Sequence, residues 1–385
     1  MKMNATNSAS MKQSNRRLVL NIIRKKPSSR AELASITGLT RAAVTMIVDD
    51  LISEGLLIET GSIDSGFGRK PVILDLNNKS LFALGLCIAR EGCFICISDI
   101  KAEFLLKQEF VLDQSGGVDD CLQTLISKTK KIISDSGVPY KRMIGMGIAV
   151  PGPVDIYNGT ILNPPNFNLW HNVNIVSAFK KHFDFPVYVE NNAASLALAE
   201  KAYGRGVDFD SFMLLVVNEG VGAGIIIKDK LYKGEKGFGS EVGHTTIDFN
   251  GRQCSCGNKG CIETYASVPA VIETVRNDGI MLDSWEEVID KALDGNERCK
   301  RAVEDEALYL SAGIVNTINT LELEAVILTG DINYKPKLLL EAIEKNAEST
   351  LITRNLRKLH IMNSSITENI EVKAAASIVL DRFFS

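Results

Sequence analysis

The chain has 385 residues, of which 45% are hydrophobic and 23% charged, and a formal net charge of −4. This composition is typical of a globular protein with two or three domains. No apolar run approaches the roughly 20 residues that a membrane span requires, and the polar N-terminus lacks the apolar core of a signal peptide. We therefore expect a cytoplasmic protein that does not bind membranes, in which the eight cysteines bind metal or are buried and do not form disulfides.

The charge is distributed unevenly along the chain. Residues 1–71 contain 11 Lys and Arg against 6 Asp and Glu, so this segment carries +5 and the remainder carries −9. A basic segment at one end of an acidic body is the asymmetry expected of a domain that binds phosphates. The first segment is therefore a candidate for contact with nucleic acid.

Residues 12–76 have the pattern of a winged helix-turn-helix domain. Ser29 and Glu32 form a capping box that begins a short helix, and Gly38 ends this helix. Thr40 caps a second helix, which has one apolar stripe and a small, polar face at its N-terminal end. Two helices joined by a tight glycine turn, the second with such a face, are typical of a recognition helix that enters a major groove.

Two expected strands, 56–60 and 72–76, follow these helices, and the loop between them contains Gly68-Arg69-Lys70-Pro71. Such a wing can place a basic side chain in a minor groove. Helix-turn-helix units also mediate protein contacts, but the charge asymmetry favours DNA. The residues predicted to contact DNA are Arg16, Arg17, Ser29, Arg30, Thr40, Arg41, Ala42, Thr45, Arg69 and Lys70; Arg24, Lys25 and Lys26 are further candidates for phosphate contacts.

From residue 81 onwards, strand patterns alternate with helix patterns, which predicts an α/β fold. The expected strands are 84–88, 94–98, 144–150, 187–190, 213–217, 224–227 and 325–328. The expected helices are 121–133, 193–203, 303–321 and 337–350. Cys87, Cys93 and Cys96 lie in apolar strands and are interpreted as core residues.

One histidine and three cysteines lie within 18 residues in the second half of the chain. Four nitrogen and sulfur ligands suit a tetrahedral Zn²⁺ ion, and a site without an open coordination position is structural. Glycines between the last two cysteines allow the chain to reverse around the ion. The predicted zinc ligands are His244, Cys254, Cys256 and Cys261, and the glycines are Gly257 and Gly260.

Several of these motifs together resemble the ROK family (repressors, open reading frames and kinases), in particular its xylose-operon and N-acetylglucosamine repressors. They are Ser29-Arg30-Ala31-Glu32-Leu33-Ala34, Gly68-Arg69-Lys70-Pro71, and Gly243-His244 with the cysteine cluster. The resemblance covers nearly the whole chain. It implies a winged helix-turn-helix followed by a two-lobed, actin-like ATPase body related to sugar kinases. The first lobe would be 80–190, completed by a C-terminal helix 370–385, and the second lobe, with the zinc knuckle, 191–369.

Polar side chains that could bond sugar hydroxyls occur near the ends of apolar segments. Glu190-Asn191-Asn192 follows a buried strand, where open α/β sheets bind ligands, and Asn166 precedes Trp170, a ring that could stack on a sugar. The resemblance implies a sugar site between the lobes. Its residues would be Asn166, Asn191, Asn192, Glu241, His244 and Glu263, with one ring nitrogen of His244 on zinc and the other on the sugar.

Three departures from the pattern of the family's kinases predict that the chain neither binds ATP nor transfers phosphate. Asn192 stands where the kinases have a catalytic Asp, and an amide cannot accept the proton, which typically costs ~10²–10⁴ in rate. The segment 85–90 lacks the acid and paired glycines of the first phosphate loop. Glu219 adds negative charge to the second loop, whose glycines we interpret as turns that preserve the fold: Gly220, Gly222 and Gly224.

These features together predict a sugar-responsive transcriptional repressor of carbohydrate-utilisation genes that is not an enzyme. It is expected to bind a palindromic operator as a homodimer, or as a dimer of dimers. Two alternatives stay open: an active ROK sugar kinase with a regulatory DNA-binding head, and a regulator that senses a transport-system protein. The identity of the sugar, the operator sequence, and whether sugar releases or tightens DNA binding also stay open.

Overall fold

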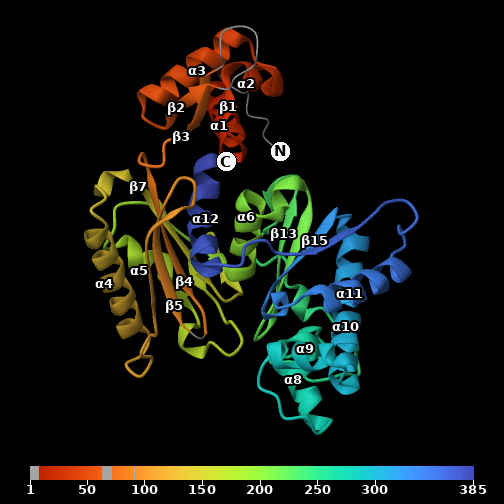
Figure 1. The fold of residues 1–385 in the computed structure, drawn as a ribbon. Coiled ribbons are helices and arrows are strands. Elements are labelled where there is room, and N and C mark those ends of the chain that lie inside the picture. The colour runs from red at the N-terminus through yellow and green to blue at the C-terminus, as the bar shows by residue number, and fades with distance from the viewer. Residues whose placement is uncertain (1–7, 63–71, 91) are drawn as a thin grey trace.

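The computed structural model describes residues 8–62, 72–90 and 92–385, and shows a small head above a body of two lobes (Figure 1). The head contains α1 (Ser8–Lys25), α2 (Arg30–Thr37) and α3 (Arg41–Ser53). Its antiparallel sheet has the order β1-β3-β2, made of β1 (Ser28–Ser29), β2 (Leu57–Ser62) and β3 (Val72–Leu76). The two expected helices and the two expected wing strands are confirmed.

The helix caps of the head follow from local chemistry. The Ser29 hydroxyl accepts a hydrogen bond from the Glu32 backbone N–H at 3.3 Å, and the Glu32 carboxylate accepts one from the Ser29 backbone N–H at 2.7 Å. Gly38 adopts the left-handed conformation that ends α2, and the Thr40 hydroxyl accepts from the Ala43 backbone N–H at 3.2 Å to begin α3. Because these bonds satisfy donors that a helix end leaves open, they fix the angle at which α3 leaves the turn.

The body contains two five-stranded sheets with the same topology. In each, three antiparallel strands in succession are followed by two parallel strands added on the far side of the first. The first sheet has the order β11-β7-β4-β5-β6, made of β4 (Phe82–Ile88), β5 (Cys93–Asp99), β6 (Phe104–Phe110), β7 (Met143–Val150) and β11 (Val187–Asn191). The second has the order β14-β13-β12-β15-β16, made of β12 (Phe212–Val217), β13 (Val221–Ile227), β14 (Lys230–Leu231), β15 (Ala325–Gly330) and β16 (His360–Asn363). This duplication confirms the α/β body of the actin-like ATPase type.

Helices cover both faces of each sheet (Figure 1). The outer face of the first sheet packs against α4 (Val118–Ser136) and α5 (Ile175–Lys180). The outer face of the second packs against α10 (Glu297–Leu321) and α11 (Lys337–Thr350), and α8 (Val268–Asn277) and α9 (Trp285–Leu293) pack on α10. Between the sheets, α6 (Asn192–Tyr203) and α12 (Ile370–Phe384) pack against each other. Of the described helices, none is long and apolar enough to cross a bilayer.

Glycines in the strands allow the two inner helices to approach the sheets closely. A Cβ at Gly224 would lie 2.6 Å from the Ala197 Cβ of α6, and one at Gly85 would lie 2.8 Å from the Ala376 backbone nitrogen of α12. The interpretation of Gly222 and Gly224 as turns is therefore wrong: both lie inside β13, where they make room for a helix. Only a residue without Cβ permits so short a distance between helix and strand.

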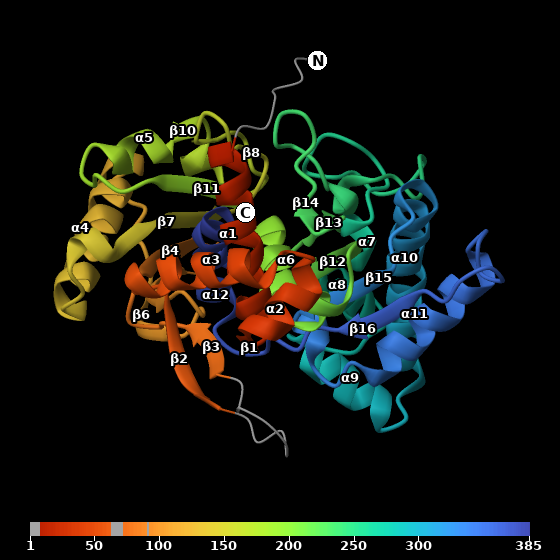
Figure 2. The same cartoon turned by 90° about the horizontal axis from the view of Figure 1, so that it is seen from above.

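The head rests on the end of α12. Seen from above, α1 lies over α12 (Figure 2), and the two helices share one apolar cluster that includes Val19, Ile23, Leu380 and Phe384. The interpretation of Arg24 as a phosphate contact is wrong, because its guanidinium points into this joint and donates to the Tyr203 hydroxyl at 3.0 Å. The sequence could not show this, since the two residues lie 179 positions apart.

Candidate functional site

A cavity of about 570 Å³ lies between the two lobes. Its walls come from the ends of β4, β7, β11, β12 and β15, from the first turns of α6 and α12, and from the segments around residues 241–244 and 263. Five of the six residues predicted to bind sugar line it: Asn191, Asn192, Glu241, His244 and Glu263. Strands that end at one edge of a parallel sheet bring residues that are distant in sequence to a common place.

Asn191 and Asn192 stand where β11 ends and α6 begins. The Asn191 side-chain oxygen caps α6, accepting from the Ala193 N–H at 2.8 Å and the Ala194 N–H at 3.3 Å. The Asn192 side-chain oxygen accepts a weak hydrogen bond from the Cys87 thiol at 3.8 Å. Both amides are thus held in place by the fold, and neither can act as a base toward a sugar hydroxyl.

Carboxylates occupy the part of the cavity formed by the turn between β12 and β13. Glu263 accepts a hydrogen bond from the Val221 backbone N–H at 3.0 Å, and a Cβ at Gly220 would lie 2.6 Å from the same carboxylate. Glu219 is exposed at the tip of this turn and lines the cavity. Glu219 brings negative charge to this turn, and like charge opposes the approach of a phosphate group.

Glu241 lies in the same wall. The pKa of its carboxyl group is raised, mainly by burial. The nearby His244 opposes this increase, and Glu263 adds to it. A carboxyl group in such surroundings can accept hydrogen bonds from adjacent hydroxyls, which is how carboxylates hold polyols.

The sixth predicted residue, Asn166, does not line the cavity. Its side chain is exposed and its backbone φ is +56°, although the preceding Pro165 does line the wall and accepts a hydrogen bond from Arg90 at 2.9 Å. The interpretation of Trp170 as a stacking ring is wrong: it is fully buried and stacks on Phe167, with ring centroids 5.7 Å apart. The ring is therefore part of the apolar core of the first lobe and does not face a ligand.

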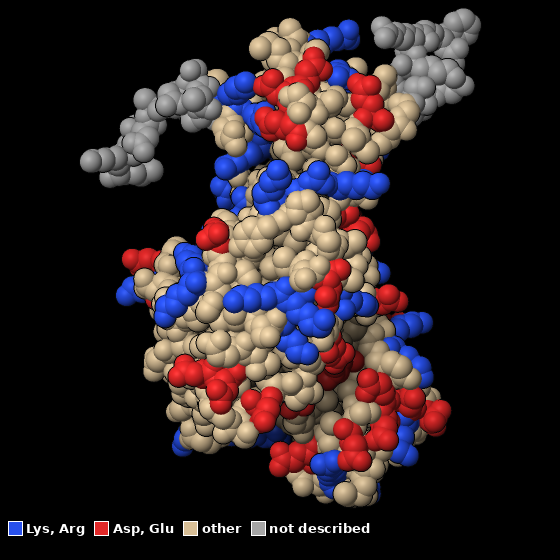
Figure 3. Space-filling model, turned by 90° about the vertical axis from the view of Figure 1, so that its left-hand side faces the viewer, with Lys and Arg blue, Asp and Glu red and all other residues tan. Residues whose placement is uncertain are grey.

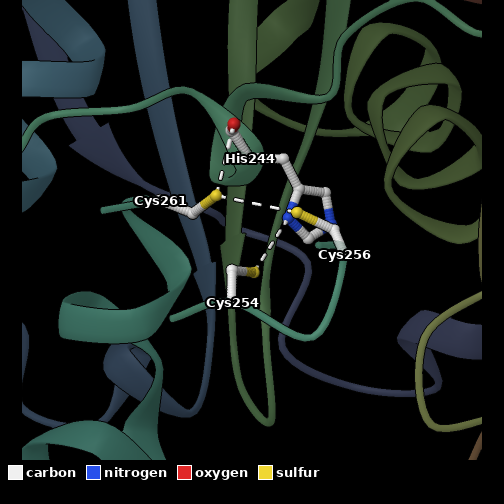
Figure 4. Close-up of side chains that lie close together, drawn as sticks. All are labelled: His244, Cys254, Cys256 and Cys261. Atoms are coloured by element: carbon white, nitrogen blue, oxygen red, sulfur yellow. Dashed lines mark hydrogen bonds between the residues drawn. The ribbon is translucent and has the colours of Figure 1, made fainter. Parts of the chain in front are cut away.

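The predicted metal ligands come together in one cluster (Figure 4). The side-chain ligand atoms of His244, Cys254, Cys256 and Cys261 all lie within 4.8 Å of one another. The Cys256 and Cys261 sulfurs are 3.7 Å apart, as are the Cys254 sulfur and the His244 Nδ1. These four side chains could hold a metal ion, and His244 also lines the cavity, so the cluster and the cavity share a residue.

The glycines of this segment act as predicted. Gly257 and Gly260 have φ values of +94° and +66°, which L-residues rarely adopt, and a Cβ at Gly260 would collide with the Asp248 carbonyl. They allow the chain to fold three cysteines and one histidine around a single point.

The outward face of α3 is exposed, as a recognition helix requires. Thr40, Arg41, Ala42 and Thr45 are exposed near its N-terminal end, and Met46 is 68% exposed. The opposite face of the helix is buried in the head. Its apolar residues are Val44, Ile47, Val48 and Leu51, each at most 6% exposed.

Two predicted DNA-contacting arginines have acidic partners within the head. Arg16 pairs with Glu54 at 2.5 Å, and Arg30 pairs with both Asp49 and Glu59 at 2.9 Å. Arg17 is exposed, whereas Ser29 is buried as the α2 cap. The predicted wing residues Arg69 and Lys70 lie outside the described residues.

Figure 3 shows a band of Lys and Arg where the head meets the body, with Asp and Glu gathered higher on that face.

Part of the cavity wall is made of residues that the sequence does not predict. The end of β15, the segments that follow β15 and β16, and the start of α12 also line it, with Thr329, Asn333, Ile366 and Glu371. Nothing in their local sequence distinguishes them from solvated loop residues, because only the duplicated topology brings these segments to the cleft.

A family model described as "ROK family" matches residues 84–382, which is most of the chain and begins just after the head. The chain belongs to the ROK family. Among curated relatives, the xylose repressor of Bacillus spizizenii is 32% identical, over 97% of this chain and 96% of its own length. The N-acetylglucosamine repressor of Escherichia coli O157:H7 is 26% identical, over 91% of this chain and 88% of its own.

The solved structures that match include a regulator and kinases, which differ in how much of this chain they cover. A ROK family transcriptional regulator, described as a homologue of the E. coli MLC protein, matches with a TM-score of 0.82 and 27% identity, covering 97% of both chains. A ROK glucokinase from Streptomyces griseus matches with a TM-score of 0.66 and 22% identity, covering 77% of this chain and 98% of its own, a likeness that concerns the fold alone. The regulators of the family share the head as well as the body, and this chain is a regulator and not an enzyme.

Proposed function

We propose that this chain is a transcriptional repressor whose head binds operator DNA and whose cleft binds a sugar as a signal. The observation that carries the proposal is the composition of the cleft. It gathers five residues suited to sugar hydroxyls, while one of them, Asn192, takes the position of the base, and Glu219 adds a carboxylate to the turn between β12 and β13. A protein that binds a sugar but cannot activate its hydroxyl for phosphate transfer can respond to the presence of the sugar without consuming it.

The DNA-binding assembly of the proposal is a homodimer on a palindromic operator. Residues 12–76 would form the DNA-binding domain, 80–190 with 370–385 the first lobe, and 191–369 the second. The exposed face of α3 would enter the major groove, and the heads of two subunits would reach half-sites one helical turn, or a multiple of it, apart.

The metal of the cluster is proposed to be structural zinc. In a tetrahedral site with Zn–S distances of about 2.3 Å, neighbouring sulfurs lie about 3.8 Å apart, close to the 3.7 Å between Cys256 and Cys261. The ion would fix the ring of His244, leaving its other nitrogen to face the cavity, so that metal binding orders one wall of the sugar site.

Metal content measured by elemental analysis tests the zinc proposal. One zinc per chain is expected in the wild type and almost none in Cys256→Ser. The matched control is Cys299→Ala, which changes a buried cysteine of α10 outside the cluster and should retain the metal. Full zinc content in Cys256→Ser would contradict the assignment.

The function itself is tested with the full-length protein and operator DNA selected from a random-sequence pool. Fluorescence anisotropy would measure DNA affinity with and without each member of a panel of monosaccharides that includes xylose, glucose and N-acetylhexosamines. We expect a palindromic selected site, a change of affinity with at least one sugar, and no ADP release with any sugar and ATP. Sugar-dependent ADP release would instead favour the kinase, and a response only to a transport-system protein would favour the other alternative.

A further inference from the structure

Two helices connect the cleft with the head. α6 begins at Asn191 and Asn192 in the cleft wall, and α12 begins near Ile370 and Glu371 in the same wall. With 12 and 15 residues, they are about 18 Å and 22 Å long at 1.5 Å per residue. Both end beneath the head, at Tyr203 and Phe384 (Figure 1).

The two helices are attached to different sheets. α6 packs on β12 and β13 of the second sheet, where Gly224 allows close contact with Ala197. α12 packs on β4 and β7 of the first sheet, where Gly85 allows close contact with Ala376. α6 and α12 also pack against each other. If the lobes move relative to each other and each helix stays with its own sheet, the two helices must slide along their mutual contact.

One side chain of the head contacts the far ends of both helices. The Arg24 guanidinium donates to the Tyr203 hydroxyl at 3.0 Å and lies 4.9 Å from the centre of the Tyr203 ring. It also lies 4.5 Å from the centre of the Phe384 ring. Next to it, the Asn21 amide donates to the Phe384 carbonyl at 2.6 Å, which ties α1 to α12 a second time.

This position makes Arg24 sensitive to the arrangement of the lobes. A planar guanidinium between two rings has a narrow range of favourable geometries, and a lysine cannot reproduce both the stacking and the directed hydrogen bond. A shift of Tyr203 against Phe384 would break one of its contacts or turn the head. The neighbouring Lys25 and Lys26 are exposed and take no part in this joint.

We propose that Arg24 is the positioning residue through which movement between the lobes reaches the DNA-binding head. The inference rests on the proposed function, and it assigns Arg24 to signal transmission in place of DNA binding. A sugar that binds the two lobe arrangements with different affinity changes the Tyr203–Phe384 spacing, and Arg24 converts that change into a reorientation of α1.

The test measures coupling, defined as the ratio of operator dissociation constants with and without the sugar identified from the panel. Coupling between sites typically amounts to 5–150-fold. Arg24→Ala should bring the ratio close to 1 while still binding both DNA and sugar, and Arg24→Lys should restore it only in part. Lys25→Ala is the matched control: it removes a charge from the adjacent position and should leave the ratio at the wild-type value.

Reciprocity provides a second readout that a purely structural role would not produce. In the wild type, operator DNA should change sugar affinity by the same factor as sugar changes operator affinity, and in Arg24→Ala this effect should vanish as well. If Arg24→Ala does not fold, Tyr203→Phe removes only the hydroxyl that accepts the hydrogen bond and should reduce the ratio.

The outcomes separate the two hypotheses. A wild-type protein that binds operator but responds to no sugar refutes the proposed function and removes the basis of this inference. A responsive wild type with an unchanged ratio in both Arg24→Ala and Tyr203→Phe refutes the inference alone. A salt dependence of DNA binding that falls by about 0.9 in log–log slope in Arg24→Ala, with an unchanged ratio, would identify Arg24 as a phosphate contact.

Discussion

Replacing Gly224 by alanine is expected to push α6 away from β13. The new Cβ would lie 2.6 Å from the Ala197 Cβ and would also collide with the Ala193 carbonyl oxygen. Because carbon atoms in contact are about 3.6 Å apart, the helix must retreat by about 1 Å. Overpacking of this kind costs about 1–3 kcal/mol in the free energy of unfolding.

The same displacement moves the cleft wall. Asn191 and Asn192 begin α6, so their amides should shift with it, and a misplacement of about 1 Å is enough to weaken a preorganised site strongly. We expect the affinity for the effector sugar to fall by about tenfold or more. The change in stability is measured by the midpoint of guanidinium unfolding followed by circular dichroism, and the change in affinity by isothermal titration with zinc present.

Gly222→Ala is the matched control, because it adds the same methyl group to the same strand. Its Cβ would lie 3.1 Å from the Ala193 Cβ, so the helix needs to move by only about 0.5 Å, and the cost should stay below about 1 kcal/mol. Equal unfolding midpoints and equal sugar affinities for the two variants would refute the account of how α6 is seated.

Three further predictions concern other parts of the chain. Thr40→Ala should lower the stability of the head by about 1 kcal/mol and weaken operator binding, whereas Thr40→Ser should restore both, as measured by hydrogen exchange of α3 and by anisotropy. Asn192→Asp should not produce ADP release in a coupled assay, because Glu219 still adds negative charge to the turn between β12 and β13 and segment 85–90 still lacks paired glycines; turnover would contradict this explanation. Glu306 is fully buried, which raises the pKa of its carboxyl group well above the usual value, so the unfolded chain loses its proton first and stability should fall as pH rises above the unfolded pKa of about 4.3. Glu306→Gln should remove this slope of up to ~1.4 kcal/mol per pH unit, exposed Glu304→Gln should keep it, and parallel denaturation curves at several pH values would decide.

Features decided by local chemistry could be predicted from the sequence. The caps at Ser29 and Thr40 each involve residues three positions apart, so the local sequence is enough to predict the helices of the head. The spacing of the ligands also predicts the metal cluster, since three of its members lie within eight residues and the glycines between them have positive φ.

Features decided by packing over long distances in sequence could not be predicted. Trp170 looked like a sugar-stacking ring because it follows a polar loop, but the core of the first lobe contains it. Arg24 looked like one more basic residue of a basic segment, but α6 and α12 provide rings for its guanidinium. In both cases an aromatic ring or a charge has several uses, and only the contacts decide among them.

The position of α12 in the first lobe also affects how the protein is made. The Cys96 thiol of β5 bonds to the Val372 carbonyl, 276 residues later in the chain. At a synthesis rate of about 5–20 residues per second, α12 is synthesised roughly 14–55 s after β5, and until then it cannot cover the inner face of the first sheet. During that time an apolar surface that includes Ala83 and Cys96 is open to solvent and to other nascent chains. Slower translation should therefore lengthen the time for which this surface can contact chaperones or other chains.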